Sequence, residues 1–196
     1  MIATESLSVA RPRSFDENAV LAAAMHAFRR EGYHRTSVTG LERTTGLRAS
    51  SLYNAYGDKA GLFRRALDHY LATFVAPRLA AYVGPQATLE DLEGLFLSLF
   101  EPPLDDGFGC LVTNSATELG GDPLAVPGVA AGIEALAHHL DPMLERELGS
   151  TTDTGTLVLL YHGLLVLSRA GLLTDRHRQA VHTEFARLRA RREEAQ

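Results

Sequence analysis

The chain has 196 residues, of which 45% are hydrophobic and only one is cysteine. This length and composition suit one or two compact domains and exclude a disordered tail. A single cysteine excludes an intrachain disulfide framework and a cysteine-rich zinc module, so we expect a cytoplasmic protein. The N-terminus lacks the apolar stretch of a signal peptide, and the most apolar segment, residues 156–167, is too short to cross a bilayer, so no membrane span is expected.

The net charge of −5 is unevenly distributed along the chain. Residues 1–65 contain ten Lys or Arg and six Asp or Glu, a net charge of +4, which leaves −9 for residues 66–196. A basic part joined to an acidic part suggests that only the basic part meets a polyanion such as nucleic acid. A chance division of surface charge would look the same, so the sequence motifs have to decide.

The first predicted helix has clear end signals. Ser14 to Glu17 have the form of a capping box, in which the serine side chain accepts from the backbone and the glutamate reaches back. The helix should extend to about Glu31, and Gly32 should end it. Residues 1–13 precede this helix as a short, mildly basic arm.

The next two predicted helices have the spacing of a helix-turn-helix. Ser37 can cap a helix over residues 38–45, and Gly46 supplies a tight turn before a helix over residues 49–56. The later helix is the candidate to enter a DNA major groove. There an Asn side chain can bond adenine and an Arg side chain can bond guanine. Its exposed polar residues are Ser50, Ser51 and Asn54, flanked by Arg48. A hairpin inside an all-α enzyme is the alternative interpretation of this pattern.

The remainder of the chain also shows helical periodicity. Asp58 can cap a long helix that should end near Pro77. Residues 156–173 are apolar almost all round and must therefore be buried on every side, either in the core of one chain or against a symmetry mate. The other helices are predicted over residues 88–100, 107–119, 122–148 and 175–192.

The order F-R-R-E-G-Y, then T-S-V-x-x-L, then T-G-L-R-x-S-S-L-Y-N-A-Y-G-D-K strongly resembles the N-terminal DNA-binding domain of the TetR/AcrR family of transcriptional regulators. The resemblance covers residues 15–67, about a quarter of the chain. It implies an all-α homodimer whose N-terminal three-helix helix-turn-helix head, residues 14–60, follows the flexible arm. It also implies a larger C-terminal helical body, residues 61–196, that binds an effector and dimerises through the last two long helices.

The function implied by the resemblance is sequence-specific binding of a double-stranded DNA operator. A repressor released from a palindromic operator by a small-molecule or electrophile effector is the family's usual form, without a cofactor and without enzymatic activity. Leu52-Tyr53 and Gly57-Asp58-Lys59 match the family's pattern, in which the tyrosine and the lysine meet DNA phosphates. The candidate DNA-contacting residues are Thr36, Ser37, Arg48, Ala49, Ser50, Ser51, Tyr53, Asn54 and Lys59.

Two residues depart from the pattern of the head. Glu42 stands where helix-turn-helix domains usually carry alanine, so we expect it to snorkel or to pair with Arg43 or Arg48. Arg48 stands where a capping serine is common, which would let the reader helix start one residue later. Both departures bear on which side chain meets which base.

The segment G-C-L-V-T-N-S-A-T-E-L resembles one branch of the family, in which some members respond to electrophiles or small organic ligands. Cys110, near a helix start, is a candidate sensor thiol, or else a small buried hydrophobic residue. Asn114 and Glu118 follow at one-turn intervals and are candidate pocket residues, or else capping or surface groups.

Two other classes of function stay open at this point. Cys110 and one of eight histidines could form a nucleophile and base, but the chain contains no Gly-x-Ser-x-Gly, P-loop or dinucleotide motif. The histidine spacings do not match a metal site such as His-Glu-x-x-His, so no metal is expected. The other alternative is a DNA-binding protein without an effector, although the acidic body is large for dimerisation alone.

Overall fold

The computed structural model describes residues 15–102, 104, 106–124 and 126–194, and these residues form helices and no strands. The all-α prediction is confirmed, and the arm predicted over residues 1–13 lies outside the described residues. The α-helices are α1 Glu17–Glu31, α2 Val38–Thr45, α3 Ala49–Tyr56, α4 Lys59–Tyr70, α5 Ala76–Tyr82, α6 Leu89–Leu97, α7 Leu111–Leu119, α8 Val126–Leu148, α9 Thr154–Arg169 and α10 Asp175–Glu194.

The start of α1 differs from the prediction. Asp16 caps the helix, because its Oδ1 accepts the N–H groups of Asn18 and Ala19 at 3.0 and 3.2 Å. The predicted capping box begins at Ser14, which lies outside the described residues, whereas the cap in the described part of the chain comes from the residue directly before the first helical residue. The predicted end is confirmed, because Gly32 follows Glu31 with a φ of 85°.

The helix-turn-helix has the predicted bounds. The Ser37 side chain accepts the N–H of Gly40 at 3.0 Å and caps α2, and Gly46 adopts the left-handed conformation after Thr45. α3 begins at Ala49, so the later start suggested by Arg48 is wrong. The short, capped helices leave little freedom in the angle between α2 and α3.

The helix that starts at Lys59 does not end at Pro77. A π-helical turn, Leu71–Val75, joins α4 to α5, and the Ala76 N–H bonds the Leu71 carbonyl. Pro77 lies in the first turn of α5, where its missing N–H costs least. The wider turn lets the chain continue to Tyr82, which corrects the expected end of this helix.

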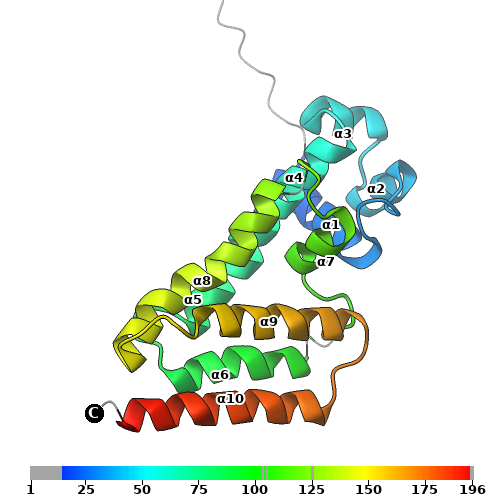
Figure 1. Cartoon of the computed structure of the whole chain (residues 1–196). Helices are drawn as coiled ribbons and strands as arrows, with labels where there is room; N and C mark the ends of the chain where they lie inside the picture. Colours follow the sequence, from blue (N-terminus) through cyan, green and yellow to red (C-terminus); the bar gives the residue numbers. More distant parts are fainter. Residues whose placement is uncertain (1–14, 103, 105, 125, 195–196) are drawn as a thin grey trace, which may run out of the picture.

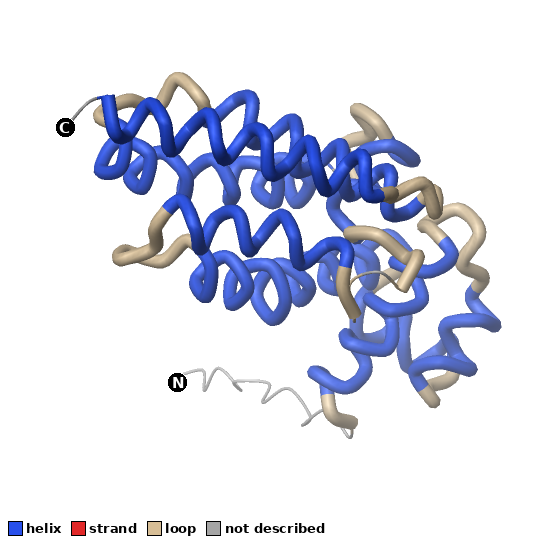
Figure 2. The backbone as a smooth tube through the Cα atoms, turned by 90° about the horizontal axis from the view of Figure 1, so that it is seen from below, coloured by secondary structure: helices blue, strands red, loops and turns tan. Residues whose placement is uncertain are grey.

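Figure 1 shows the head, α1 to α3 and the first part of α4, at one end of the molecule. α4, α5 and α8 lead from the head to the body, where α6, α9 and α10 lie roughly parallel; Figure 2 shows this body from below. α7 connects the two parts, because it packs against α1 as well as against α8 and α9.

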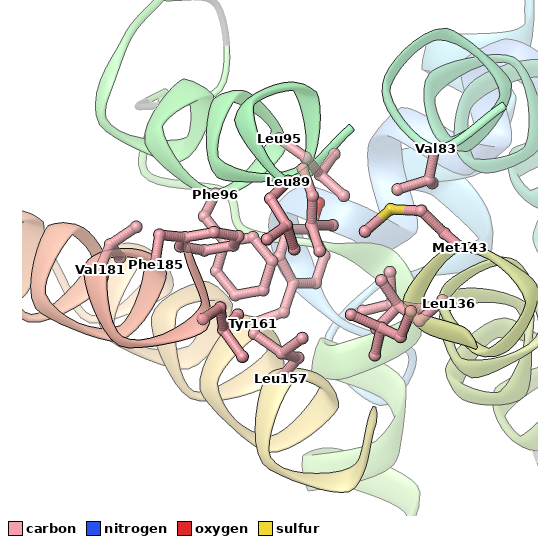
Figure 3. Close-up of a cluster of buried hydrophobic side chains, with 14 of the residues drawn as sticks. Val83, Leu89, Leu95, Phe96, Leu136, Met143, Leu157, Tyr161, Val181 and Phe185 are labelled. Atoms are coloured by element: carbon pink, nitrogen blue, oxygen red, sulfur yellow. The ribbon is translucent and has the colours of Figure 1, made fainter. Parts of the chain in front are cut away.

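The described residues contain two hydrophobic clusters. In the head, the fully buried Phe28 and Phe63 meet edge to face with ring centroids 5.2 Å apart. In the body, Phe96 lies between Tyr161 and Phe185 at centroid distances of 5.2 and 5.3 Å (Figure 3). α4 and α7 contribute to the head cluster, so the head core extends beyond the helix-turn-helix itself.

Candidate nucleic-acid interface and internal cavity

One face of α3 is polar and exposed. Ser50, Ser51 and Asn54 are exposed, and Tyr53 keeps 39% of its surface accessible, whereas Leu52 on the inner face is only 1% exposed. Short side chains on an exposed helix permit close approach to the base edges in a major groove. The structure thus brings four of the predicted contact residues onto one surface.

The other predicted contacts near α3 differ in exposure. Ser37 and Arg48 are exposed at the starts of α2 and α3, and Ala49 is half-buried. Thr36 is only 1% exposed, and its hydroxyl donates to the Gly32 carbonyl at 2.5 Å. The Thr36 side chain therefore packs inside the connection between α1 and α2, which corrects the expectation that it is available to DNA.

Lys59, the first residue of α4, is held against the α1–α2 connection. Its Nζ lies 4.6 Å from the centroid of the Tyr33 ring and 3.4 Å from the His34 carbonyl oxygen. Burial lowers the pKa of Lys59, and the Glu118 carboxylate acts in the opposite direction. The ammonium is thus partly ordered before any ligand arrives, which reduces the entropy lost when it binds an anion.

Glu42 makes a contact that differs from the one expected from its position in the sequence. Its Oε1 accepts the N–H of Ala49 at 2.7 Å, so a side chain of α2 satisfies the first helical N–H of α3. Arg48, the N-cap residue of α3, makes no capping bond with its own side chain. The expectation that Glu42 snorkels or pairs with Arg43 or Arg48 is therefore wrong.

An internal cavity of about 50 Å³ lies where α7 meets the body helices. Cys110, the residue directly before α7, and Val112 of α7 contribute to its wall. Tyr70 also faces it, and both burial and the Cys110 side chain raise the pKa of Tyr70 well above its usual range. The wall is mostly apolar and includes Phe74, Val75, Leu79, Leu99, Leu104, Gly132, Leu136 and Leu165.

His162 supplies an unusual polar group to this cavity. Its Nδ1 lies 3.1 Å from the Thr113 hydroxyl, whereas its Nε2 is buried and has no hydrogen-bond partner among the described residues. Burial lowers the pKa of His162, so the neutral ring is favoured. Because Nε2 lacks a partner, Cys110 and His162 share the cavity wall without the hydrogen bond of a nucleophile and its base.

Asn114 and Glu118 do not line the cavity, which corrects their prediction as pocket residues. The Asn114 amide donates to the carbonyls of Arg29 and Phe108 at 3.2 and 2.8 Å. The Glu118 oxygens accept the N–H groups of Tyr33 and His34, each at 2.8 Å. Both side chains bond backbone groups of the head, at the end of α1 and in the α1–α2 connection, and neither contributes to the cavity wall.

Two arginines complete this contact between head and body. Arg29 of α1 donates to the Gly109 carbonyl at 2.6 Å and pairs with Asp106 at 2.8 Å. Arg169, at the end of α9, donates to the Arg30 carbonyl at 2.9 Å. The end of α1 is therefore bonded to the loop before α7 and to α9. Arg29 and Gly109 take part in this contact and also line the cavity.

One face of α9 is exposed and contains no charged residue. Leu159 is 77% and Val166 44% exposed, and Gly155, Gly163 and Ala170 extend the same stripe at intervals of three or four residues. The opposite face, with Leu157 and Tyr161 among others, packs in the body core. The alternative that this helix is buried within one chain is therefore wrong.

Several residues of these sites were not predicted. Arg29, His162 and Arg169 gain their roles from elements that meet only in the folded chain, so no local pattern marked them. The signal for Glu42 was its departure from the alanine usual at that position. In the described part of the chain, no group of three His, Cys, Asp or Glu side chains could hold a metal ion, and no helix is long and apolar enough to span a membrane.

A capped helix pair joined at a left-handed glycine, with a polar outer face and a helical body, defines a helix-turn-helix protein. Residues 20–66 match the model of the family described as bacterial regulatory proteins, tetR family. The fold of nearly the whole chain also matches members of that family. By this sequence match over residues 20–66 and by its overall fold, the chain is similar to the TetR family of regulatory proteins.

Three relatives illustrate the match. The HTH-type transcriptional repressor ComR of Escherichia coli (strain K12) is 35% identical over 115 residues, which cover 57% of this chain and 55% of ComR. BdcR, an HTH-type transcriptional repressor of the same strain, is 39% identical over 67 residues, 34% of each protein. The matched part thus spans about half of ComR and a third of BdcR.

The third relative is a solved structure of a cysteine mutant of the TetR family regulator CifR complexed with a 26-bp operator DNA. It superposes with a TM-score of 0.71 at 28% identity, and the match covers 90% of this chain and 98% of that one.

Proposed function

We propose that this protein is a transcriptional repressor that binds a palindromic operator as a homodimer. The exposed polar face of α3 carries the proposal, because its short side chains and the flanking Arg48 suit base edges in a major groove. ComR and BdcR are named repressors, and the CifR structure contains operator DNA, which supports the same role here. Repressor activity, rather than activation, rests on these relatives.

The proposed contacts divide into two kinds. Ser50, Ser51, Asn54 and Arg48 face the bases, whereas Tyr53 and Lys59 meet phosphates, with help from the exposed Ser37 and the backbone at Ala49. Phosphate contacts position the protein on any duplex, and base contacts choose the sequence. Substitutions in the two groups should therefore have different effects.

We expect Lys59→Ala to weaken binding to selected and random duplexes alike, because a phosphate contact carries no sequence information. The slope of log affinity against log salt should fall by about 1. Asn54→Ala should instead change which sequences are enriched when the protein selects from random duplexes. Fluorescence anisotropy across a salt series measures the first effect, and sequencing of selected duplexes measures the second.

Arg176→Ala, which removes an exposed charge from α10, is the matched control for Lys59→Ala. An unchanged salt slope in Lys59→Ala would remove the phosphate role. An unchanged sequence profile in Asn54→Ala would remove that side chain from the reading face.

The proposed dimer uses the exposed stripe of α9. Leucine, valine, alanine and two glycines leave an uncharged strip on which a second copy can pack closely, and α10 flanks it with Ala180, Thr183, Ala186 and Ala190. A two-fold axis through this surface would place two α3 helices on one DNA molecule. Their centres must then lie about 34–36 Å apart, or a multiple of that distance, to reach successive major grooves.

The proposed effector is a small, mostly apolar organic molecule that carries one hydrogen-bonding group. The apolar wall suits the body of such a ligand. The buried Nε2 of His162, which has no hydrogen-bond partner in the described part of the chain, suits its polar group. A cavity of about 50 Å³ holds only a few water-sized groups, so a larger ligand must push its wall outward.

α7 would carry this displacement to the head. Val112 packs tightly on α8, since a Cβ built on Gly132 would lie 2.6 Å from a Val112 methyl, so α7 can yield only away from α8. Asn114 and Glu118, farther along α7, bond the end of α1 and the α1–α2 connection. A ligand would reorient the head because it binds the displaced state more tightly than the undisplaced one. The coupling free energy between ligand binding and DNA binding is typically about 1–3 kcal/mol.

If Cys110 is the sensor, N-ethylmaleimide should release the protein from DNA, and Cys110→Ser should abolish that response while DNA binding is retained. The thiol adds to the maleimide double bond and brings a bulky group into the cavity wall. Because Cys110 is the only cysteine, one added mass per chain identifies the modified residue. A full response in Cys110→Ser would restrict Cys110 to packing and leave a non-covalent effector.

A further inference from the structure

The reader helix α3 obtains its N-terminal cap from another helix. The first N–H groups of any helix lack intrahelical partners and are usually satisfied by the N-cap side chain. Here the N-cap residue is Arg48, a side chain with donors only, and it makes no capping bond. The half-buried Glu42 supplies an acceptor from α2, with Oε1 2.7 Å from the Ala49 nitrogen.

This bond joins the two helices of the helix-turn-helix across the turn at Gly46. Besides satisfying a donor, it fixes the start of α3 relative to α2, at the end that enters a groove first. A carboxylate is also favoured at the positive end of the helix dipole. The usual alanine could not make this contact.

We propose that Glu42 is a positioning residue that fixes the reader helix for sequence-specific DNA binding, in the place of an N-cap side chain. Its negative charge also repels DNA phosphates. Glu42 therefore lowers the affinity for every duplex but increases the ratio of operator affinity to random-duplex affinity. The proposal rests on the DNA-binding function proposed above.

The two effects of Glu42 are separable by substitution. Glu42→Gln keeps an acceptor oxygen and removes the charge, so the cap should persist and all duplexes should bind more tightly with a steeper salt dependence. Glu42→Ala removes both, so amide exchange at Ala49 should accelerate about fivefold, the effect expected for a lost cap. The affinity ratio between a selected site and a random duplex should fall by a similar factor.

Glu31→Ala is the charge-matched control, because Glu31 is the last residue of α1 and the bond to the Ala49 N–H comes from Glu42. It should leave both amide exchange in α3 and the affinity ratio unchanged. A rescue separates capping from general loss of stability, since Glu42→Ala combined with Arg48→Ser places an ordinary capping side chain at the N-cap. Slow exchange at the start of α3 should then return.

The test combines two measurements on the 196-residue chain. Mass spectrometry or NMR follows amide hydrogen exchange, and titrations measure DNA binding. An unchanged rate of amide exchange at Ala49 in Glu42→Ala would contradict the claim that Glu42 caps α3. Faster exchange with an unchanged affinity ratio would overturn the role in specificity. If the parent protein bound no DNA, the proposed function would fail, whereas the exchange data would still decide whether Glu42 caps α3.

Discussion

Replacing Leu159 by arginine is expected to produce a monomer whose affinity for a selected DNA site is about 100-fold or more below that of the parent. Leu159 lies in the middle of the exposed stripe on α9 and keeps 77% of its surface accessible in one chain. In a two-fold dimer the same residue arrives from both copies, so the substitution buries two positive charges in one apolar interface.

The loss of DNA affinity follows from the geometry of paired half-sites. When one head is bound, the second head binds in an intramolecular step, and such linkage raises affinity by about 10²–10⁴-fold without new contacts. A monomer loses this gain although its α3 surface is intact. Analytical ultracentrifugation gives the oligomeric state, and titration of one duplex with each variant gives the affinity.

Gln86→Arg is the control for Leu159→Arg, because Gln86 is exposed in the turn between α5 and α6 and receives the same charge. It should remain dimeric with parental DNA affinity. A Leu159→Arg variant that is still dimeric would show that the interface lies on another surface. A monomeric variant with parental affinity would show that dimerisation does not support DNA binding.

The second large effect is expected from Phe63→Ala and Phe96→Ala, which remove the same side chain from two different cores. Phe63 and Phe96 are 1% and 0% exposed. Each substitution should lower the free energy of unfolding by about 3–5 kcal/mol, the usual cost of truncating a buried phenylalanine. Urea denaturation followed by circular dichroism measures this loss.

The two variants should differ in which activity they lose first. Phe63 contacts Phe28 and Tyr33 in the head, with the Tyr33 centroid 5.1 Å away, so Phe63→Ala should weaken DNA binding while the dimer persists. Phe96 packs between α9 and α10, so Phe96→Ala should weaken the dimer. Loss of both activities in equal proportion in both variants would mean that head and body unfold as a single unit.

The helices of the head were predictable because their end signals are local. Ser37 and Gly46 stand next to the helices that they delimit, so α2 and α3 could be placed from the sequence. The path after Tyr70 was not predictable in the same way. Proline usually ends a helix, and nothing local indicated that a π-helical turn would accommodate Pro77 and carry the chain to Tyr82.

The candidate sites were predictable only where one helix makes them. The exposed face of α3 follows from helical spacing, whereas the capping bond from Glu42 needs a turn that brings residues 42 and 49 together. Asn114 and Glu118 lie in the helix that Cys110 precedes, but the neighbouring α1 and the α1–α2 connection determine that they bond the head and do not line the cavity. The Nε2 of His162 has no hydrogen-bond partner among the residues that the structure describes. This depends on the packing of several helices, so no local sequence pattern predicts it.

Selection of bound sequences from a pool of random duplexes, with the number of chains per duplex counted on the enriched site, tests the proposed function most directly. We expect enrichment of two inverted half-sites whose centres lie about one helical turn, 34–36 Å, or a multiple of it apart. Two chains, or a multiple of two, should occupy each site. Enrichment of a single unpaired half-site bound by one chain, or no enrichment at all, would contradict a dimeric repressor that reads DNA through α3.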